Sequence, residues 1–576
     1  MQKLIRRRPS VAPLNAPHLS PLLQRLYASR GVVSATELEY GLANLLKPNF
    51  KGLDAARELL GEAVMAGARI LVVGDFDADG ATSSALAVLA LKALGLSDVH
   101  FLVPNRFEYG YGLTPEIVQV AAGYEPDIIL TVDNGISSIE GVAAAQRLGI
   151  AVVVTDHHLP GAELPTAEAI VNPNQVGCPF PSKNLAGVGV IFYVMNAVRA
   201  YLREQNWFAE AGITEPNMAS FLDLVALGTV ADVVPLDFNN RLMVSQGLAR
   251  MRSGVARLGI NALCKIANRE PSKLCAADLG FALGPRLNAA GRLDDMSLGI
   301  QCLLTDSEAT ALEIAQQLDE FNRDRKAIEA GMQQEALKML QKFEGADAAN
   351  LPFGMCLFEE TWHQGVIGIL ASRIKDRFHR PTIVFADMGE GFIKGSARSI
   401  PGLHIRDTLE SIAARKPHLL QKFGGHAMAA GMSVERRYFE EFAQAFDEEV
   451  RNNLPVENLQ ASILSDGELS AEEINLDNAY SLKNAGPWGQ HFTEPTFDGE
   501  FVVVQHRILG EKHLKLTLAV EGAAQQWVDA IAFNIDPAPW LNAKPQRVRV
   551  AYRLDVNEFR GNTNVQLLAE YVEIIQ

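Results

Sequence analysis

One short stretch, Gly74–Gly80, most constrains what this chain can fold into. The mainly apolar segment 69–73 precedes it and predicts a buried strand. The Ala- and Leu-rich segment 81–94 follows it and predicts a helix. Between them lie three carboxylates, Asp75, Asp77 and Asp79. Ligands of open α/β sheets bind where strands end and helices begin, so three crowded charges at this edge predict a divalent metal site.

Two other interpretations compete with the metal site. A single Asp after a strand is usually a helix cap or an Asx turn, but one cap satisfies a helix end, so three alternating Asp residues favour the metal. The spacing also mimics the start of a calcium-binding loop. That loop needs a Glu at its twelfth position, where this chain has Leu86, and a strand precedes the stretch instead of a helix. We therefore reject the calcium loop.

The totals of the chain bound its class. Its 576 residues predict three or four domains, and 48% apolar residues argue against global disorder. No apolar stretch approaches the roughly 20 residues of a membrane span, and no secretory signal follows the basic N-terminus. The five scattered cysteines are typical of reduced thiols in a cytoplasmic protein. The net charge of −16 argues weakly against nucleic acid, although local basic segments matter more.

Strands and helices alternate from about residue 67 to 155, which predicts βαβ units with a mainly parallel sheet. The expected strands are 69–73, 99–103, 127–132 and 151–155. Two further polar clusters follow strands, Asp133-Asn134-Gly135 and Asp156-His157-His158. Such clusters at one sheet edge are hard to explain as separate caps. Asp232 lies in an apolar run and needs a cation or hydrogen-bond donors, unless it is a simple cap.

These residues together suit a particular metal chemistry. The set consists of Asp75, Asp77, Asp79, Asp133, His157, His158 and Asp232. Oxygen ligands with one or two imidazoles favour Mn²⁺ or Mg²⁺ over a structural zinc. Two such ions can deprotonate a water and stabilise the oxyanions of phosphoryl displacement. His158 is a ligand, orients a ligand, or donates to the phosphate.

Basic and Gly-rich segments predict phosphate contacts farther along the chain. A loop over 284–292 contains Arg286 and Arg292, which suit phosphate oxygens but can also be solvated surface residues. After a long helix over 306–343, a second α/β unit spans about 351–452. It contains Gly-rich turns with Ser396, Arg398 and His426, which favour phosphate contact over a plain turn requirement.

Strand patterns dominate from about residue 460 to the end, and their alternation predicts a five-strand barrel. Arg553, Phe559 and Arg560 in this region can bind a single strand by charge and stacking, or they can be ordinary turn residues.

Several motifs resemble one known family. Asp156-His157-His158 is similar to the signature of the DHH phosphoesterase superfamily, and Gly424-Gly425-His426 resembles that of its associated C-terminal domain. The segments DFDADG, VDNG, LAGVGV, LGTVADVVPL and LGPRLNAAGR and the terminal OB-like barrel occur in the order of its bacterial exonucleases specific for single-stranded DNA. The resemblance covers nearly the whole chain beyond the first ~50 residues.

The resemblance implies an α/β fold with five parts. These are an N-terminal arm (1–50), a parallel-sheet catalytic domain (51–305), a connecting helix (306–345), a DHH-associated substrate-binding domain (346–455) and an OB-fold nucleic-acid-binding domain (456–576). It also implies a metal-dependent exodeoxyribonuclease that hydrolyses single-stranded DNA from 5′ to 3′ by two-metal-ion catalysis, in DNA recombination and repair, including mismatch repair.

Residue roles follow from the same resemblance. Two Mn²⁺ or Mg²⁺ ions are expected on Asp77, Asp79, Asp133, His157 and Asp232, with Asp75 and His158 as catalytic residues. A 5′-phosphate pocket is expected from the Arg106 loop and from Ser396 and Arg398, while Arg286 lines the path of the strand and His426 contacts substrate. The expected partners are single-strand-binding protein and a RecQ-type helicase, and the chain is expected to be a cytoplasmic monomer.

Two alternatives stay open beside this hypothesis. A small-molecule phosphoesterase of the same superfamily would cleave pyrophosphate, cyclic dinucleotides or very short oligonucleotides, but the barrel and the Arg-bearing loops favour a polymer. A catalytically inactive relative would lack some of the acids, and none of them is missing.

Overall fold

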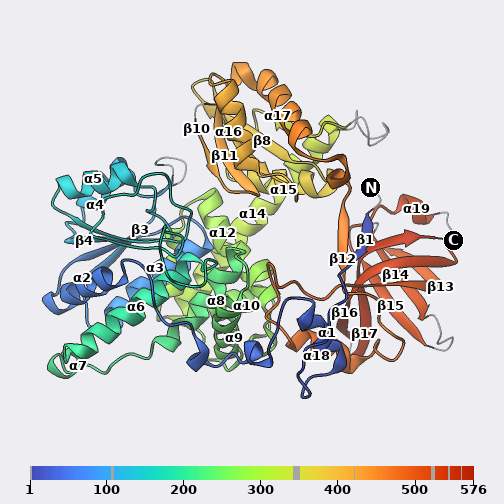
Figure 1. Cartoon of the computed structure of the whole chain (residues 1–576), viewed down its shortest axis with the longest axis horizontal. Helices are drawn as coiled ribbons and strands as arrows, with labels where there is room; N and C mark the ends of the chain where they lie inside the picture. Colours follow the sequence, from blue (N-terminus) through green and yellow to red (C-terminus); the bar gives the residue numbers. More distant parts are fainter. Residues whose placement is uncertain are drawn as a thin grey trace. The chain divides into compact units, whose positions relative to one another are not determined.

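The computed structural model describes most of the chain. The described residues are 3–105, 109, 111–340, 351–420, 422–510, 512–520, 526–541, 545–559 and 561–575. They divide into two compact units, Met1–Arg7 with Arg323–Ser465, and Arg8–Asn322 with Asp466–Gln576 (Figure 1). The predicted catalytic and barrel regions therefore belong to the same unit.

A five-stranded parallel sheet organises the catalytic region, as predicted, in the order β3-β2-β4-β5-β6. Its strands are β2 (Ile70–Val73), β3 (Val99–Leu102), β4 (Ile128–Val132), β5 (Ala151–Thr155) and β6 (Ala169–Val171). The three-residue β6 was not predicted, because so short a segment has no clear periodicity. The strand order reverses beside β2, and such switch points are where open α/β sheets bind ligands.

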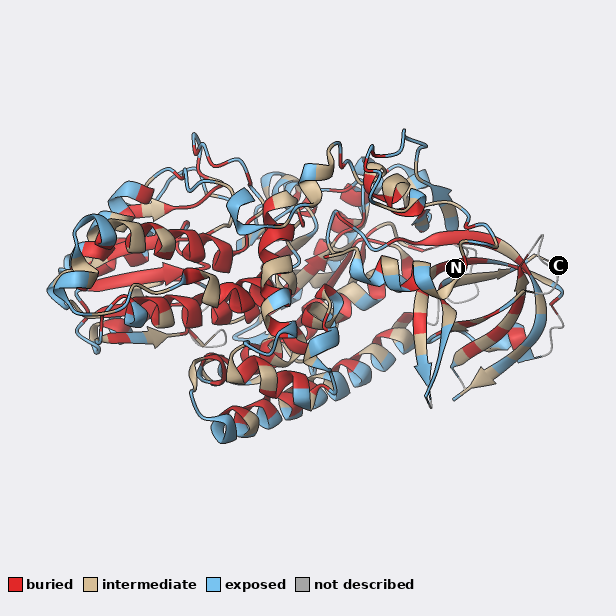
Figure 2. Cartoon of the chain, turned by 90° about the horizontal axis from the view of Figure 1, so that it is seen from below, coloured by how far each residue is buried: buried red, intermediate tan, exposed pale blue. Residues whose placement is uncertain are grey.

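Helices cover both faces of this sheet (Figure 1). Alternate residues of β2 point to opposite faces, so Leu71 and Val73 pack in the cluster that includes α4 and α5, whereas Ile70 and Val72 pack in the cluster with α2, α3 and α6. These helices are α2 (Leu53–Ala66), α3 (Ala78–Ala93), α4 (Pro115–Ala122), α5 (Ile139–Arg147) and α6 (Gly187–Glu204). The central strands β2 and β4 are buried along their whole length, and buried strands appear red in Figure 2.

A helical subdomain follows the sheet. Its helices are α7 (Trp207–Glu210), α8 (Leu222–Ala231), α9 (Phe238–Arg252), α10 (Leu258–Ile266), α11 (Ala276–Asp278), α12 (Gly284–Leu293) and α13 (Ser297–Leu304). The expectation of a loop over 284–292 was wrong, because this segment forms α12 directly after a π-helical turn, Leu279–Leu283. Pro285 misled the prediction, although proline is compatible with a first helical turn.

The predicted long helix is α14 (Glu308–Leu340). It starts in one compact unit and continues into the other, where a second sheet has the order β10-β11-β9-β8-β7. The strands are β7 (Met355–Phe358), β8 (Thr382–Gly389), β9 (Phe392–Arg398), β10 (Lys422–Gly425) and β11 (Ala429–Glu435). The helices are α15 (Ile367–Phe378), α16 (Ile405–Arg415) and α17 (Phe439–Asn453).

One Gly-rich segment of this α/β unit, around Gly395, is a strand and not the predicted turn, whereas Gly424 and Gly425 end β10 at a turn that carries His426. Gly395 lies in β9, where a Cβ atom would come within 2.5 Å of the Phe385 ring. Glycine is therefore required there by aromatic packing. The same unit also contains a small parallel pair, β1 (Leu4–Arg7) with β12 (Ser462–Ser465).

The C-terminal region is a closed five-stranded barrel in the order β13-β14-β15-β17-β16, which confirms the OB-like prediction. Its strands are β13 (Phe497–Leu509), β14 (His513–Val520), β15 (Trp527–Ala532), β16 (Arg547–Phe559) and β17 (Asn562–Ile574), with α18 (Leu476–Asn484) and α19 (Ala538–Leu541) beside them in sequence. The N-terminal helix α1 (Pro21–Ala28) joins the core, and its Tyr27 hydroxyl donates to the Ala485 carbonyl at 2.7 Å.

Two further expectations concern the whole chain. Among the described helices, none combines the length and the apolar character that crossing a bilayer requires. All five cysteines are free thiols, as their scatter predicted.

Candidate metal centre

The loop after β2 and the start of α3 hold the carboxylates of Asp77 and Asp79 through hydrogen bonds to two different helices. Asp77 is the N-cap of α3, and its Oδ1 accepts the backbone N–H groups of Asp79 and Gly80 at 2.9 and 3.0 Å. The capping interpretation was therefore correct for Asp77, but both bonds use Oδ1 and leave Oδ2 for a cation. Asp79 is buried and accepts the N–H groups of Gly187 and Val188 at 2.6 and 3.0 Å, at the start of α6. The helix N-terminus favours the negative charge there.

The end of β4 brings in Asp133 at a conformation that few non-glycine residues adopt. Its φ is +62°, and its N–H donates to the Thr155 carbonyl at 3.0 Å. Gly187 lies directly against it, because a Cβ at that position would come within 2.6 Å of the Asp133 Cβ. The glycine of the LAGVGV segment thus gives Asp133 room beside Asp79.

The end of β5 carries the DHH residues, and Asp156 organises the two histidines. Its Oδ1 accepts the N–H groups of His157 and His158 at 2.7 and 3.1 Å and lies 2.7 Å from His158 Nδ1, while Oδ2 accepts the Ile136 N–H at 2.9 Å. Asn174 and Asn172 donate to the carbonyl oxygens of His157 and His158 at 2.6 and 2.9 Å.

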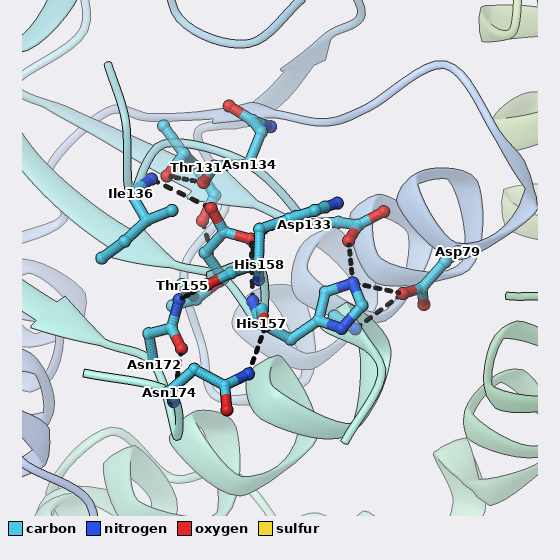
Figure 3. Close-up of polar contacts among 12 residues, drawn as sticks. Asp79, Thr131, Asp133, Asn134, Ile136, Thr155, His157, His158, Asn172 and Asn174 are labelled. Atoms are coloured by element: carbon cyan, nitrogen blue, oxygen red, sulfur yellow. Dashed lines mark hydrogen bonds and ion pairs between the residues drawn. The ribbon is translucent and has the colours of Figure 1, made fainter. Parts of the chain in front are cut away.

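His157 lies at the centre of the carboxylates (Figure 3). Its Nε2 is 3.1 Å from Asp133 Oδ1, 3.6 Å from Asp232 Oδ2 and 3.9 Å from Asp79 Oδ2. Asp232 reaches this position as the C-cap of α8, far from the sheet in sequence. Four segments that are distant in sequence therefore converge at one edge of the sheet, as predicted.

The carboxylates are held close enough to disturb one another's ionisation. Burial and then the Asp232 carboxylate raise the pKa of Asp79 to about 7. Burial and then Asp77 raise the pKa of Asp232 to about 8. The pKa of Asp133 lies well above its usual value because of burial and of Asp79 and Asp77. A cation at this edge would offset the repulsion that causes these shifts.

His158 differs from His157 in charge. Burial alone would lower the pKa of His158, but the hydrogen bond to Asp156 and the surrounding carboxylates outweigh it and raise the pKa to about 9. Burial and then the neighbouring His158 lower the pKa of His157. His157 is therefore suited to be a neutral metal ligand, and His158 to be a cation at neutral pH.

The residues present fit a divalent cation. Three groups have ligand atoms within 4.8 Å of one another, namely Asp75 with Asp77 and Asp133, Asp79 with His157 and Asp232, and Asp133 with His157 and His158. Asp133 Oδ1 and His157 Nε2 are buried, and neither forms a hydrogen bond with any described residue. Carboxylate oxygens with one or two imidazoles match Mn²⁺ or Mg²⁺.

Several predicted substrate residues lie away from this cluster. Arg286 is on α12, where its Nη2 pairs with Asp319 at 2.8 Å and its Nη1 donates to the Ala282 carbonyl at 2.6 Å. Its contact with a DNA strand stays a prediction. Arg106 and Arg560 lie outside the described residues. Arg553 pairs with Glu494 and Glu570, whereas the Phe559 side chain near it in sequence is exposed.

In the other unit, Ser396 and Arg398 lie on β9 with their polar groups together. Arg398 Nη1 donates to Ser396 Oγ at 3.2 Å and to the Ala397 carbonyl at 2.8 Å. Burial lowers the pKa of Arg398, and its described hydrogen bonds go to Ser396 and Ala397 and not to a carboxylate. His426 is exposed just after β10 and donates its backbone N–H to Ala429.

Sequence reasoning missed four residues around the site. Asp156 stands in the predicted motif but was given no role, whereas Asn172, Asn174 and Tyr111 were not considered. The Tyr111 hydroxyl lies 3.3 Å from His158 Nδ1 and Nε2. The Asn-Pro-Asn segment after β6 is a polar cluster at a strand end, and that signal would have identified the two asparagines.

Comparisons with known proteins agree with this geometry. The family models described as "DHH family, N-terminal domain", "DHHA1 domain" and "RecJ OB domain" match residues 69–229, 351–452 and 465–571. A Salmonella typhimurium protein named single-stranded-DNA-specific exonuclease RecJ is 55% identical over 99% of both chains. The Escherichia coli protein of the same name is 55% identical over 96% of both chains.

Solved structures of a RecJ protein also match this chain. The crystal structure of Thermus thermophilus RecJ in complex with Mn²⁺ matches 99% of this chain and 80% of that chain, with a TM-score of 0.80 and 29% identity. Its complex with Mg²⁺ matches with a TM-score of 0.76 and 27% identity over 99% of this chain and 78% of that chain. The chain therefore belongs to the RecJ family of DHH proteins.

Proposed function

We propose that this chain is a metal-dependent exodeoxyribonuclease that hydrolyses single-stranded DNA from 5′ to 3′. One observation carries the proposal: carboxylates and an imidazole from four separate segments converge at the switch point of a parallel sheet. The name of these relatives, which are 55% identical over nearly their whole length, supports the choice of substrate. The closed OB barrel supports a polymeric substrate rather than a small phosphoester.

Two Mn²⁺ or Mg²⁺ ions are the proposed cofactors, with Asp77, Asp79, Asp133, His157 and Asp232 as ligands. Such a pair activates a water and stabilises the oxyanions of phosphoryl displacement. The two structures of Thermus thermophilus RecJ, one with Mn²⁺ and one with Mg²⁺, support this choice of ion.

Residues beside the ligands complete the proposed mechanism. Asp156 holds the His158 ring, so that a protonated imidazole can donate to a phosphate oxygen. Asp75 is buried in the group with Asp77 and Asp133, and we assign it the acceptance of a proton from the attacking water. His158 and Asp75 are thus the proposed catalytic residues.

Ser396 and Arg398 are the proposed contacts of the 5′ phosphate. The helix α15 begins near them, and its N-cap, Val366, offers no side-chain acceptor to the free N–H groups. A Cβ at Gly368 would come within 3.0 Å of both Ser396 Oγ and Arg398 Nη2, so glycine keeps the backbone close to these groups. A helix N-terminus, a hydroxyl and a half-buried guanidinium are a typical phosphate-binding set. Arg106 and His426 are proposed as further substrate contacts, and Arg286 as a contact along the strand.

The biological setting is part of the same proposal. We infer that the enzyme acts in recombination and repair as a cytoplasmic monomer, supplied with single strands by a RecQ-type helicase and coated by single-strand-binding protein. The family resemblance supports these partners. We also keep the five-part division of the chain with limits at 50, 305, 345 and 455, and the three matched family models are compatible with it.

End-labelled DNA tests the proposed activity. With Mn²⁺ or Mg²⁺, a 5′ label on a single strand should be released early, whereas a 3′ label should persist and a blunt duplex should resist hydrolysis. Equal rates on single strands and blunt duplexes would contradict the strand specificity. Faster cleavage of a cyclic dinucleotide than of a single strand would favour the small-molecule phosphoesterase.

A further inference from the structure

Helix α12 contacts the metal-site loop on both sides of Asp77. On one side, the Asn288 Oδ1 accepts the backbone N–H of Ala78 at 2.8 Å. On the other, Gly291 lies so close to Phe76 that a Cβ there would come within 1.8 Å of the Phe76 carbonyl oxygen. The two contacts therefore hold the peptide units that flank a proposed metal ligand, although neither residue has a ligand atom in the cluster.

The bond from Ala78 completes the hydrogen bonding at the start of α3. A helix leaves its first N–H groups without an intrahelical acceptor. Asp77 Oδ1 accepts those of Asp79 and Gly80, and the Asp77 carbonyl accepts that of Ala81 at 2.9 Å. The remaining N–H, from Ala78, is the one that Asn288 accepts. The cap thus needs α12 as well as Asp77.

The helix that supplies Asn288 is itself anchored. Arg286 pairs with Asp319 of α14 at 2.8 Å, and both side chains are nearly buried. Leu287 and Ala289, which flank Asn288, are fully buried. Asn288 is therefore presented to the loop from a fixed backbone.

We propose that Asn288 is a positioning residue for the metal ligand Asp77, and that Gly291 is required for the close approach of α12 to the loop. The inference rests on the proposed metal-dependent function. A metal ligand has to be held to within about 0.5 Å of its productive position. Asp77 uses Oδ1 as the helix cap, and its Oδ2 is the proposed ligand atom. Loss of the hydrogen bond between Ala78 and Asn288 would free the adjacent peptide unit and so change the position of Asp77 Oδ2. Outer partners of metal ligands typically change metal affinity or activity by about 10- to 100-fold when they are removed.

Three variants separate positioning from general stability. Asn288→Ala removes the acceptor, and Asn288→Asp keeps an oxygen in the same place. Asn261→Ala is the matched control, because Asn261 donates to the Ala256 carbonyl at 3.1 Å on α10, in the same unit but outside the metal cluster. The measurements are Mn²⁺ binding, followed by the electron paramagnetic resonance signal of free Mn²⁺, and the melting temperature in chelator.

We expect Asn288→Ala to bind Mn²⁺ about 10- to 100-fold more weakly, and Asn288→Asp to recover most of the affinity. Asn261→Ala should bind Mn²⁺ like the unmodified chain, whatever it does to the melting temperature. Unchanged affinity in Asn288→Ala would overturn the inference, as would an Asn288→Asp variant that binds as weakly as Asn288→Ala. If Asn288→Ala does not fold, Asn288→Ser takes its place with the same criteria. If the unmodified chain binds no Mn²⁺, the proposed function fails first.

Discussion

The two α/β sheets of this chain hold charges of opposite sign. At the edge of β2, β4 and β5, carboxylates lie so close together that their pKa values rise. On β9 of the other sheet, the guanidinium of Arg398 is half-buried, and its described hydrogen bonds go to Ser396 and Ala397 and not to a carboxylate. Both sites use a glycine and a helix N-terminus, at Gly187 of α6 and at Gly368 of α15.

Similar backbone features, a glycine and a helix N-terminus, therefore occur at two sites that differ in the charge of the ligand they favour. The N-terminus of α6 is already occupied by Asp79, so that site needs cations. The N-terminus of α15 has no side-chain cap and adjoins Arg398, so that site needs an anion. A substrate phosphate and a metal ion are the two ligands that satisfy these demands.

Removal of a metal ligand should have the largest effect. Asp133→Ala or His157→Ala should reduce hydrolysis of single-stranded DNA by about 10³-fold or more, which corresponds to about 4 kcal/mol of transition-state stabilisation. Circular dichroism should show that the fold is retained. Asp127→Ala is the matched control, because Asp127 lies at the opposite end of β4 and accepts the Arg69 N–H at 2.8 Å. Comparable losses in Asp127→Ala would contradict the assignment of the edge.

Removal of the Arg398 guanidinium should have a smaller and more selective effect on activity. Arg398→Ala should weaken the use of 5′-phosphorylated DNA by about 10- to 100-fold, because a hydrogen bond to a charged group contributes about 1.5–3 kcal/mol. DNA with a 5′ hydroxyl should be affected much less, and Arg398→Lys should restore part of the loss. Steady-state rates on both substrates measure this. An equal loss on both would show that Arg398 does not bind the terminal phosphate.

The carboxylates at the sheet edge should also make metal binding depend on pH. Asp79 and Asp232, with pKa values of about 7 and 8, hold protons in the metal-free protein that Mn²⁺ must displace. Apparent Mn²⁺ affinity should therefore rise from pH 6 to pH 8, by at most about tenfold for each proton released per pH unit. Calorimetry in buffers of different ionisation enthalpy would measure the released protons.

Metal affinity should rise with pH, but the folding stability of the metal-free protein should fall. The folded pKa values of these acids lie above the usual unfolded value near 3.8, so the folded state binds more protons between about pH 4 and pH 8. These groups should therefore lower the stability of the chelated protein as the pH rises through that range. Thermal melting in chelator tests this, and a pH-independent Mn²⁺ affinity would contradict both statements.

Removal of a side chain that supports the backbone of the histidines should have the smallest effect on activity. Asn174→Ala removes the bond to the His157 carbonyl, and we expect a loss of about 0.5–1.5 kcal/mol, or roughly tenfold at most in activity. Asn196→Ala is a suitable control, because Asn196 donates to the Phe192 carbonyl on α6 at 2.8 Å. Kinetics at saturating Mn²⁺ compare the two variants. A loss as large as that of His157→Ala would mean that Asn174 acts on the metal directly.

The sequence predicted which side chains meet at this sheet edge, because the signals there are local. A buried strand followed by Asp or His recurs at β2, β4 and β5, and parallel strands bring their ends together. Asp232 was found only because it interrupts an apolar run, and its place at the site depends on how α8 packs. Asp156 looked like one more polar residue, although it is the acceptor that organises both histidines.

The two wrong assignments of local structure involve glycine or proline residues whose role depends on tertiary packing. Gly291 and Pro285 indicated a loop, but Gly291 permits the close approach to the Phe76 carbonyl within a helix. Gly395 indicated a turn, but it accommodates the Phe385 ring within a strand. Gly291 and Phe76 are far apart in sequence, and Phe385 lies opposite Gly395 on the neighbouring strand, so neither contact could be seen in the local pattern.

The account depends most on the claim that cations bind at the carboxyl edge of β2, β4 and β5. Anomalous diffraction from crystals grown with Mn²⁺ tests it directly. The account predicts two peaks among Asp77, Asp79, Asp133, His157 and Asp232, and their loss in Asp133→Ala crystals. An empty edge at saturating Mn²⁺, or peaks confined to other parts of the chain, would contradict it.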